Sequence, residues 1–146
     1  MCLARADAAR VQGLSVEVGT RRPLAVSAPG IAILLALDAK EAERVLAANM
    51  VLIRRYDVLR ARSVERALRR SRRAGLGLNL GDIVPGLWSF GVPVFDGHGH
   101  PFAALGATGH AENYSTERIP EIAKLLRTEA RRLEEECAAL IPLIAS

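Results

Sequence analysis

Residues 87–109 read LWSFGVPVFDGHGHPFAALGATG, and this stretch carries the strongest structural signal in the chain. Alternate positions in its first half are apolar and share one face of a strand: Trp88, Phe90, Val92 and Val94. Asp96-Gly97 and Gly99 are typical of a turn, which leads into a partner strand at Phe102 to Thr108. The stretch therefore predicts an antiparallel β-hairpin.

Two short helices are predicted before the hairpin. Ser27 can cap a helix that begins at about Pro29, because a proline in the first turn lacks an N–H that would have no helical partner. Asp38 with Glu41 three residues later is a capping box, which predicts a second helix from Asp38 to about Asn49.

The segment between this second helix and the hairpin contains a connector and a further helix. Residues 49–62 are expected to be irregular, with four apolar residues packing onto the core: Met50, Val51, Leu52 and Ile53. Ser63 opens a helix that ends at Gly75, and Arg72 and Arg73 suit the negative pole of its macrodipole.

Period-two patterns predict two more strands. Leu76, Leu78 and Leu80 alternate with Gly77 and Asn79, as expected of a half-buried strand. Near the start of the chain, Val11 to Val18 contains β-branched residues on one face and predicts another strand.

A long amphipathic helix is predicted at the end of the chain, from Ser115 or Thr116 to Pro142. Its apolar stripe consists of Ile119, Ile122, Leu125, Leu126, Leu133 and Cys137.

The composition fits a single domain of the α/β class, here in the α+β form that combines helices with an antiparallel sheet. The chain has 146 residues and is 50% hydrophobic, which is enough for a single core. Its charged start lacks the apolar region of a signal peptide, and the longest apolar run, Ile31 to Leu37, is too short to cross a bilayer. We expect a cytoplasmic protein in which Cys2 and Cys137 stay reduced.

Neither metal binding nor catalysis is predicted. His98, His100 and His110 lie in and after the hairpin turn, but no set of four converging ligands accompanies them. No serine lies in a nucleophile-elbow context such as GxSxG or has an identifiable histidine and acid partner. We therefore expect no metal, no cofactor and no enzyme activity.

The run ERALRRSRRAG, residues 65–75, concentrates positive charge in a chain of net charge +4. Such a run can neutralise phosphates. No aromatic residues are interleaved with it, and no helix-turn-helix or β-ribbon pattern surrounds it. A solvated helix face is therefore the favoured interpretation.

Small residues recur in the predicted strands: Gly77, Gly81, Gly91, Gly106, Ala107 and Gly109. Glycine within strands marks either the close approach of a ligand or that of another backbone. Asn79, Ser89 and Thr108 are the few polar groups available to orient a ligand. A small apolar pocket and tight packing of a helix on the sheet are equally consistent with this pattern.

Three stretches carry a resemblance to a known family. RRPLAVSAPGIAILLAL (21–37) resembles its segment of proline and small residues that leads into the first helix. Residues 63–109 resemble its helix, strand and "G…APV-D-G" hairpin, and STERIPEIAKLLRTEARRLEEEC (115–137) resembles its closing helix. In this order, from about Cys2 to Leu140, they resemble the C-terminal effector-binding domain of the IclR family of bacterial transcription regulators.

The resemblance implies a GAF-like domain with a twisted, mainly antiparallel sheet flanked by helices. Residues 1–146 are expected to form one effector-binding domain that is truncated at its start. The N-terminal winged helix-turn-helix domain of the family is absent from this chain, so DNA would be bound only through that domain. Family members form dimers or tetramers.

By position, the resemblance also implies a set of residues that bind a small-molecule effector. They are Ser27, Ala28, Pro29, Gly30, Asn79, Ser89, Gly106 and Thr108. Ile31 stands where lysine is common in the family, and Asn79 where an acidic residue is common. Both differences remove charge, so we expect an aromatic or branched organic acid rather than a small keto acid.

Three classes of function follow. The first is a ligand sensor that modulates DNA binding by an attached domain. The second is a dimerisation module with a collapsed pocket, which the apolar tail LIPLIAS would also suit. The third is a small enzyme on a GAF-like fold, which would require a titratable residue with a partner inside the cavity.

Overall fold

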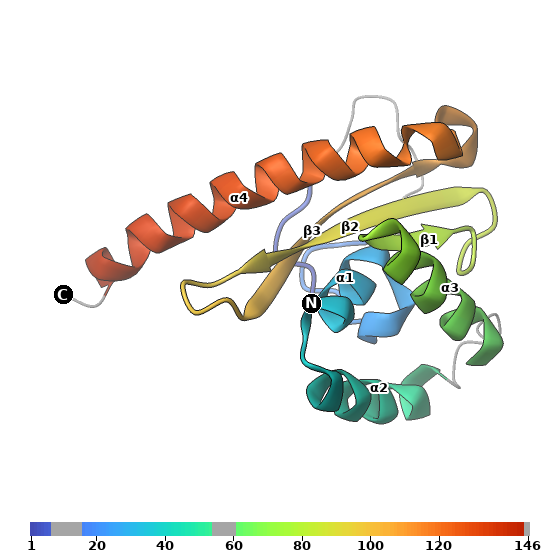
Figure 1. Ribbon diagram of the computed structural model, residues 1–146, viewed down its shortest axis with the longest axis horizontal. Coiled ribbons are helices and arrows are strands. Elements are labelled where there is room, and N and C mark those ends of the chain that lie inside the picture. Colours follow the sequence, from blue (N-terminus) through green and yellow to red (C-terminus); the bar gives the residue numbers. More distant parts are fainter. Residues whose placement is uncertain (7–15, 54–60, 145–146) are drawn as a thin grey trace.

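A computed structural model describes residues 1–6, 16–53 and 61–144 of the chain. Figure 1 shows a sheet with the long helix α4 along one face and the shorter helices on the other side. In chain order the elements are η1 (Leu24–Val26), α1 (Ala28–Ala36), α2 (Ala39–Ile53), α3 (Ala61–Ala74), β1 (Gly77–Leu80), β2 (Leu87–Phe95), β3 (Pro101–His110), η2 (Ala111–Asn113), η3 (Thr116–Arg118) and α4 (Ile119–Ile144).

The predicted hairpin is confirmed: it supplies β2 and β3, two of the three strands of an antiparallel sheet of order β1-β2-β3. Phe90 lies opposite Leu78 on β1 and opposite Ala107 on β3. The register shifts between Val94 and Phe95, next to the turn. The mixed helix and antiparallel sheet agree with the predicted α+β class.

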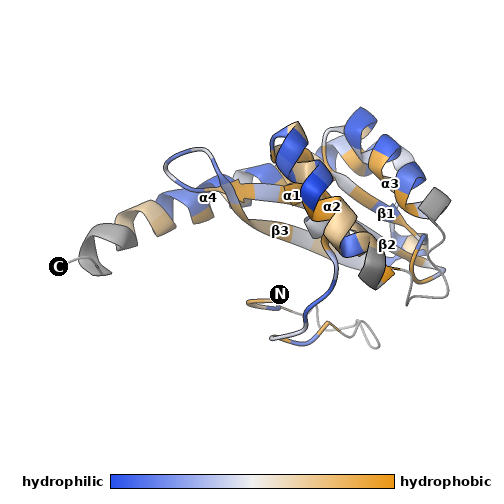
Figure 2. Cartoon of the chain, turned by 90° about the horizontal axis from the view of Figure 1, so that it is seen from below, coloured by the Kyte–Doolittle hydropathy of each residue, from blue (hydrophilic) through white to orange (hydrophobic). Residues whose placement is uncertain are grey.

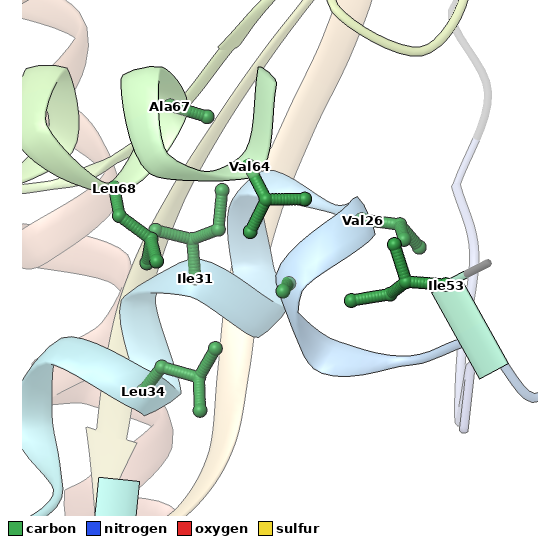
Figure 3. Close-up of a cluster of buried hydrophobic side chains, with 8 residues drawn as sticks. Val26, Ile31, Leu34, Ile53, Val64, Ala67 and Leu68 are labelled. Atoms are coloured by element: carbon green, nitrogen blue, oxygen red, sulfur yellow. The ribbon is translucent and has the colours of Figure 1, made fainter. Parts of the chain in front are cut away.

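Apolar side chains form a separate cluster on each side of the sheet. One joins η1 and α1 to α2 and α3 (Figure 3), and its buried members are Ala25, Val26, Ile31, Leu34, Ile53, Val64, Ala67 and Leu68. The other lies between the sheet and α4, and its buried members are Leu76, Leu78, Phe90, Val92, Val94, Ala123 and Ala130.

The capping signals before the hairpin are confirmed. The Ser27 hydroxyl accepts a hydrogen bond from the Gly30 N–H at 3.1 Å, and Asp38 Oδ1 accepts one from the Glu41 N–H at 2.9 Å. The helix predicted from Ser63 is α3, which ends at Ala74. Gly75 follows with φ +67°, in the left-handed region that commonly ends a helix.

The prediction of an irregular segment from Asn49 was wrong, because α2 continues to Ile53. Asn49 does not end the helix, since its Nδ2 donates to the Val45 carbonyl at 2.6 Å within the same helix. Ile53 is 1% exposed and belongs to the cluster below α1, so tertiary packing favours the extra turn. The rest of the predicted connector, residues 54–60, lies outside the described residues.

The predicted strand from Val11 to Val18 lies mostly outside the described residues. Residues 16–18, the part of it that the structure describes, do not form a strand, and Val18 is 63% exposed. Gly19 has a φ of +89° and forms a turn there, while its N–H donates to the Cys2 carbonyl. This part of the chain therefore packs against the first residues and not into the core.

Two features of the last helix also differ from the prediction. Leu125 and Leu133 of the predicted stripe are 60% and 38% exposed, whereas Ala123 and Ala130 are buried against the sheet. A small side chain on the packed face lets α4 approach the strands closely. The helix also runs to Ile144, past Pro142, which was expected to mark its end.

Candidate functional site

Three glycines form a row across the sheet beneath the start of α1. Gly77 lies opposite Gly91, and Gly91 lies opposite Gly106. A Cβ at Gly77 would be 1.9 Å from the Ala28 carbonyl oxygen, and a Cβ at Gly91 would be 2.5 Å from the Pro29 nitrogen. A Cβ at Gly106 would be 2.4 Å from Pro29 Cγ. At this row the glycines admit the first turn of α1, so tight helix packing is the arrangement observed.

A polar row lies two residues further along each strand, on the same face as the glycine row. Asn79 lies opposite Ser89, and Ser89 lies opposite Thr108. The Thr108 hydroxyl donates to Ser89 Oγ at 3.3 Å, and Thr108 is exposed. Asn79 is only 7% exposed and holds the next loop, because its Oδ1 accepts from the Asp82 N–H at 2.9 Å.

The backbone amides at the start of α1 are largely engaged within the chain. Pro29 has no N–H, the Gly30 N–H donates to Ser27 Oγ, and the Ile31 N–H donates to the Ser27 carbonyl at 2.8 Å. Ala28 is fully buried. Gly30 packs on η1, where a Cβ would be 2.1 Å from the Leu24 carbonyl oxygen. A helix start in this state offers few donors to an anion.

The predicted effector residues therefore lie in two places, the start of α1 and the two rows of the sheet, and Ala28 and Pro29 bring these together at the glycine row. Ala28 and Gly30 are committed to packing, Ser27 and Asn79 to local hydrogen bonds, and Gly106 to contact with Pro29. Ser89 and Thr108 present hydroxyl groups on the same sheet face.

Two surface grooves lie away from these rows. The larger, here called the arginine groove, has a volume of about 600 Å³ and is lined by Arg66, Arg69, Arg70, Arg73, Ala74, Leu78, Leu80, Thr116 and Ile119. The smaller, of about 320 Å³, is lined by Ala32, Leu35, Ala36, Arg72, Gly75, Leu76 and Pro93. Neither is lined by the predicted effector residues.

The arginine groove was missed because residues distant in sequence form it. Its one usable signal was the spacing of the arginines at 66, 69, 70 and 73, which places them along one side of a helix. Asp82 in the loop after β1 fixes the inner wall, since its carboxylate accepts from the Arg70 guanidinium and from the Leu80 N–H.

The histidines of the hairpin turn contact Asp96 through their backbone N–H groups. The backbone N–H groups of His98 and His100 each donate to Asp96 Oδ1 at 2.9 Å. These bonds, with His100 contributing most, hold the pKa of the Asp96 carboxyl below its usual value. Within residues 1–6, 16–53 and 61–144, no group of three or more His, Cys, Asp or Glu is placed to hold a metal ion.

The fold is thus an antiparallel sheet between a closing helix and a layer of short helices, with the first helix on a glycine row. The sequence profile described as bacterial transcriptional regulator IclR C-terminal matches residues 4–135. The chain therefore belongs to this family of transcription-regulator domains.

Solved structures of similar fold agree with this assignment. The C-terminal domain of the Escherichia coli transcriptional regulator KdgR is 26% identical, with a TM-score of 0.67 over 83% of this chain and 74% of that one. Thermotoga maritima IclR is 24% identical, with a TM-score of 0.63 over 84% of this chain and 54% of that one. The Agobacterium tumefaciens repressor BlcR is 22% identical, with a TM-score of 0.68 over 87% and 52%.

The chain spans about half the length of IclR and BlcR. No curated protein sequence matches it. Among the helices in the described ranges, none has the length and apolar character needed to cross a membrane.

Proposed function

We propose that this chain is the ligand-sensing part of an IclR-type regulator. A small organic effector would bind at the start of α1, over the sheet, and would change DNA binding by an attached winged helix-turn-helix domain. The observation that carries this proposal is the Ser89–Thr108 hydroxyl pair beside the glycine row, on the face that α1 covers. The protein would act in the cytoplasm as a dimer or tetramer, with no cofactor and no chemical step.

The surroundings of this site favour an effector of low polarity. Ile31 is 1% exposed and contributes to the apolar cluster, so it supplies no charge to a ligand. The Asn79 amide and the first amides of α1 already have partners in the chain. Two hydroxyls beside the apolar Pro29 ring suit an aromatic or branched organic acid better than pyruvate.

The site also suggests how binding would be transmitted. Pro29 lies on Gly106, one row from Thr108, so a ligand at the polar row would lie beside the first turn of α1. A ligand that prefers one position of α1 shifts the population of two arrangements of the domain by its differential affinity. The attached DNA-binding domains would respond to that shift in the oligomer.

A dimerisation module is the second candidate, and the packing at the glycine row favours it. The Ala28 carbonyl and the Pro29 ring fill the space that a larger pocket would need. In that case the face would remain closed, and organic acids would not stabilise the chain.

A thermal-shift screen with keto acids, hydroxybenzoates and branched-chain acids tests the proposal. A ligand that binds only the native state adds about 2.7 kcal/mol at a hundredfold excess over its Kd. We expect a shift with aromatic or branched acids that the double variant Ser89→Ala, Thr108→Val loses and the control Ser115→Ala retains. Absence of any shift would favour the dimerisation module, and tight pyruvate binding without aromatic-acid binding would contradict the proposed effector class.

A further inference from the structure

The arginine groove carries more positive charge than its neighbours neutralise. The Arg70 guanidinium pairs with Asp82, so this arginine forms a fixed wall. Arg69 lies 3.6 Å from Glu65, but the two side chains are 59% and 63% exposed. Solvent screens such a pair, and it contributes little.

Two arginines of the groove have no acidic partner in the part of the chain that the structure describes. Arg66 donates to the neutral Ser63 hydroxyl at 3.1 Å, and Arg73 makes no ion pair there. They are seven residues apart on α3, which places them about 10 Å apart along the helix axis. Helix α3 as a whole has six arginines and one glutamate, while the chain has a net charge of only +4. In Figure 2 hydrophilic and hydrophobic segments alternate along α3.

The rest of the groove lining is mainly apolar: Ala74, Leu78, Leu80 and Ile119. The Nε–H of Arg70 is buried and has no hydrogen-bond acceptor among the residues that the structure describes. The groove thus combines separated cations with an apolar lining.

We propose that the arginine groove binds an elongated organic dianion with an apolar middle. One carboxylate pairs with Arg66 and the other with Arg73, while the chain between them covers the half-buried side chains of Leu80 and Ile119. A compact anion fits less well, because the two unpaired guanidinium groups are spread along α3 and do not converge. A nucleic-acid backbone fits less well, because the lining between the arginines is apolar.

This site is independent of the effector site proposed above. Leu78 and Leu80 point to the α4 side of the sheet, whereas Gly77 and Asn79 point to the α1 side, since neighbouring residues in a strand face opposite ways. The groove volume of about 600 Å³ is within the range of small-molecule sites.

Calorimetric titration of the full chain with decanedioate tests the proposal. Decanoate keeps the apolar chain but has one carboxylate, and butanedioate keeps both carboxylates but is too short to reach both arginines. We expect decanedioate to bind about tenfold or more tightly than either, because each lost ion pair removes a charge-assisted hydrogen bond. Added salt should weaken decanedioate binding.

Matched variants locate the bound diacid. Arg66→Gln and Arg73→Gln should each weaken decanedioate binding about tenfold. Arg72→Gln removes the same charge from the same helix but outside this groove, so affinity should be unchanged. Ala74→Phe adds bulk to the lining at an exposed position without changing charge, and it should also block binding.

Three results would overturn the proposal: no decanedioate binding, equal loss with Arg72→Gln, or binding of poly-glutamate in preference to decanedioate. If Ser89→Ala, Thr108→Val abolishes diacid binding and the arginine variants do not, the diacid occupies the effector site. The groove proposal then fails while the proposed sensor function stands. If no acid in the thermal-shift screen stabilises the chain but decanedioate still binds in the groove, the sensor proposal fails and the groove proposal stands.

Discussion

Ser71 joins α3 to β1 by using its hydroxyl twice. Its Oγ accepts from the Leu78 N–H at 2.9 Å and donates to the Leu78 carbonyl at 3.4 Å, and the residue is fully buried. Ser71→Ala leaves the buried Leu78 N–H without this acceptor, while the Leu78 carbonyl still accepts from the Arg70 guanidinium at 3.4 Å. We therefore expect the variant to lower the free energy of unfolding by about 1–3 kcal/mol. Urea denaturation measures the loss, and Ser63→Ala, whose partner is exposed, should change stability by less than about 0.5 kcal/mol. Equal effects of the two would contradict this role.

Asp96 holds the hairpin turn through two backbone hydrogen bonds, and its pKa is lowered from 3.8 by them. A carboxyl whose folded pKa is depressed stabilises the fold above its unfolded pKa and loses that contribution as pH falls through the folded pKa. We therefore expect the His98 and His100 amides to exchange faster as pH falls below 3.8, after correction for intrinsic exchange. Asp96→Asn keeps an acceptor without a titrating charge, so its corrected exchange should show no such step.

The glycine row shows how a helix and a sheet are matched at the scale of elements. Gly91→Ala would place a Cβ 2.5 Å from the Pro29 backbone nitrogen, which has no flexible end that can move away. We expect a loss of about 1–3 kcal/mol, as for overpacking in a core. Gly97→Ala in the same hairpin meets nothing within 4 Å and is the matched control. Similar thermal midpoints for the two variants would show that α1 can lift from the sheet at little cost.

The elements that the sequence predicted well are those fixed by local chemistry. The hairpin follows from period-two alternation and its turn residues, and the start of α1 follows from Ser27. The length of α2 depends on burial of Ile53 by residues distant in sequence, and the pattern alone did not reveal this. The arginine groove likewise depends on how α3, β1 and α4 meet. Sequence patterns specify faces and caps, but tertiary packing decides which faces meet.

At the scale of the whole molecule, the two apolar clusters lie on opposite sides of one sheet. The glycine row brings α1 directly onto the strands, and Ser71 ties α3 to β1. These contacts should couple the helix layer on one side of the sheet to the cluster beneath α4 on the other. We therefore expect this domain, like most small domains, to unfold in a single cooperative transition.

The single tryptophan tests this coupling, because Trp88 packs against the cluster on the α4 side. Ile53→Val removes one methyl group from the other cluster and should cost about 1 kcal/mol. If the molecule unfolds as one unit, the urea midpoint seen by Trp88 fluorescence shifts as much as the midpoint seen by far-UV circular dichroism. Leu125→Ala, at a position 60% exposed, should leave both midpoints nearly unchanged. A fluorescence midpoint that stays fixed while the dichroism midpoint falls would mean that the helix layer unfolds separately from the sheet and α4.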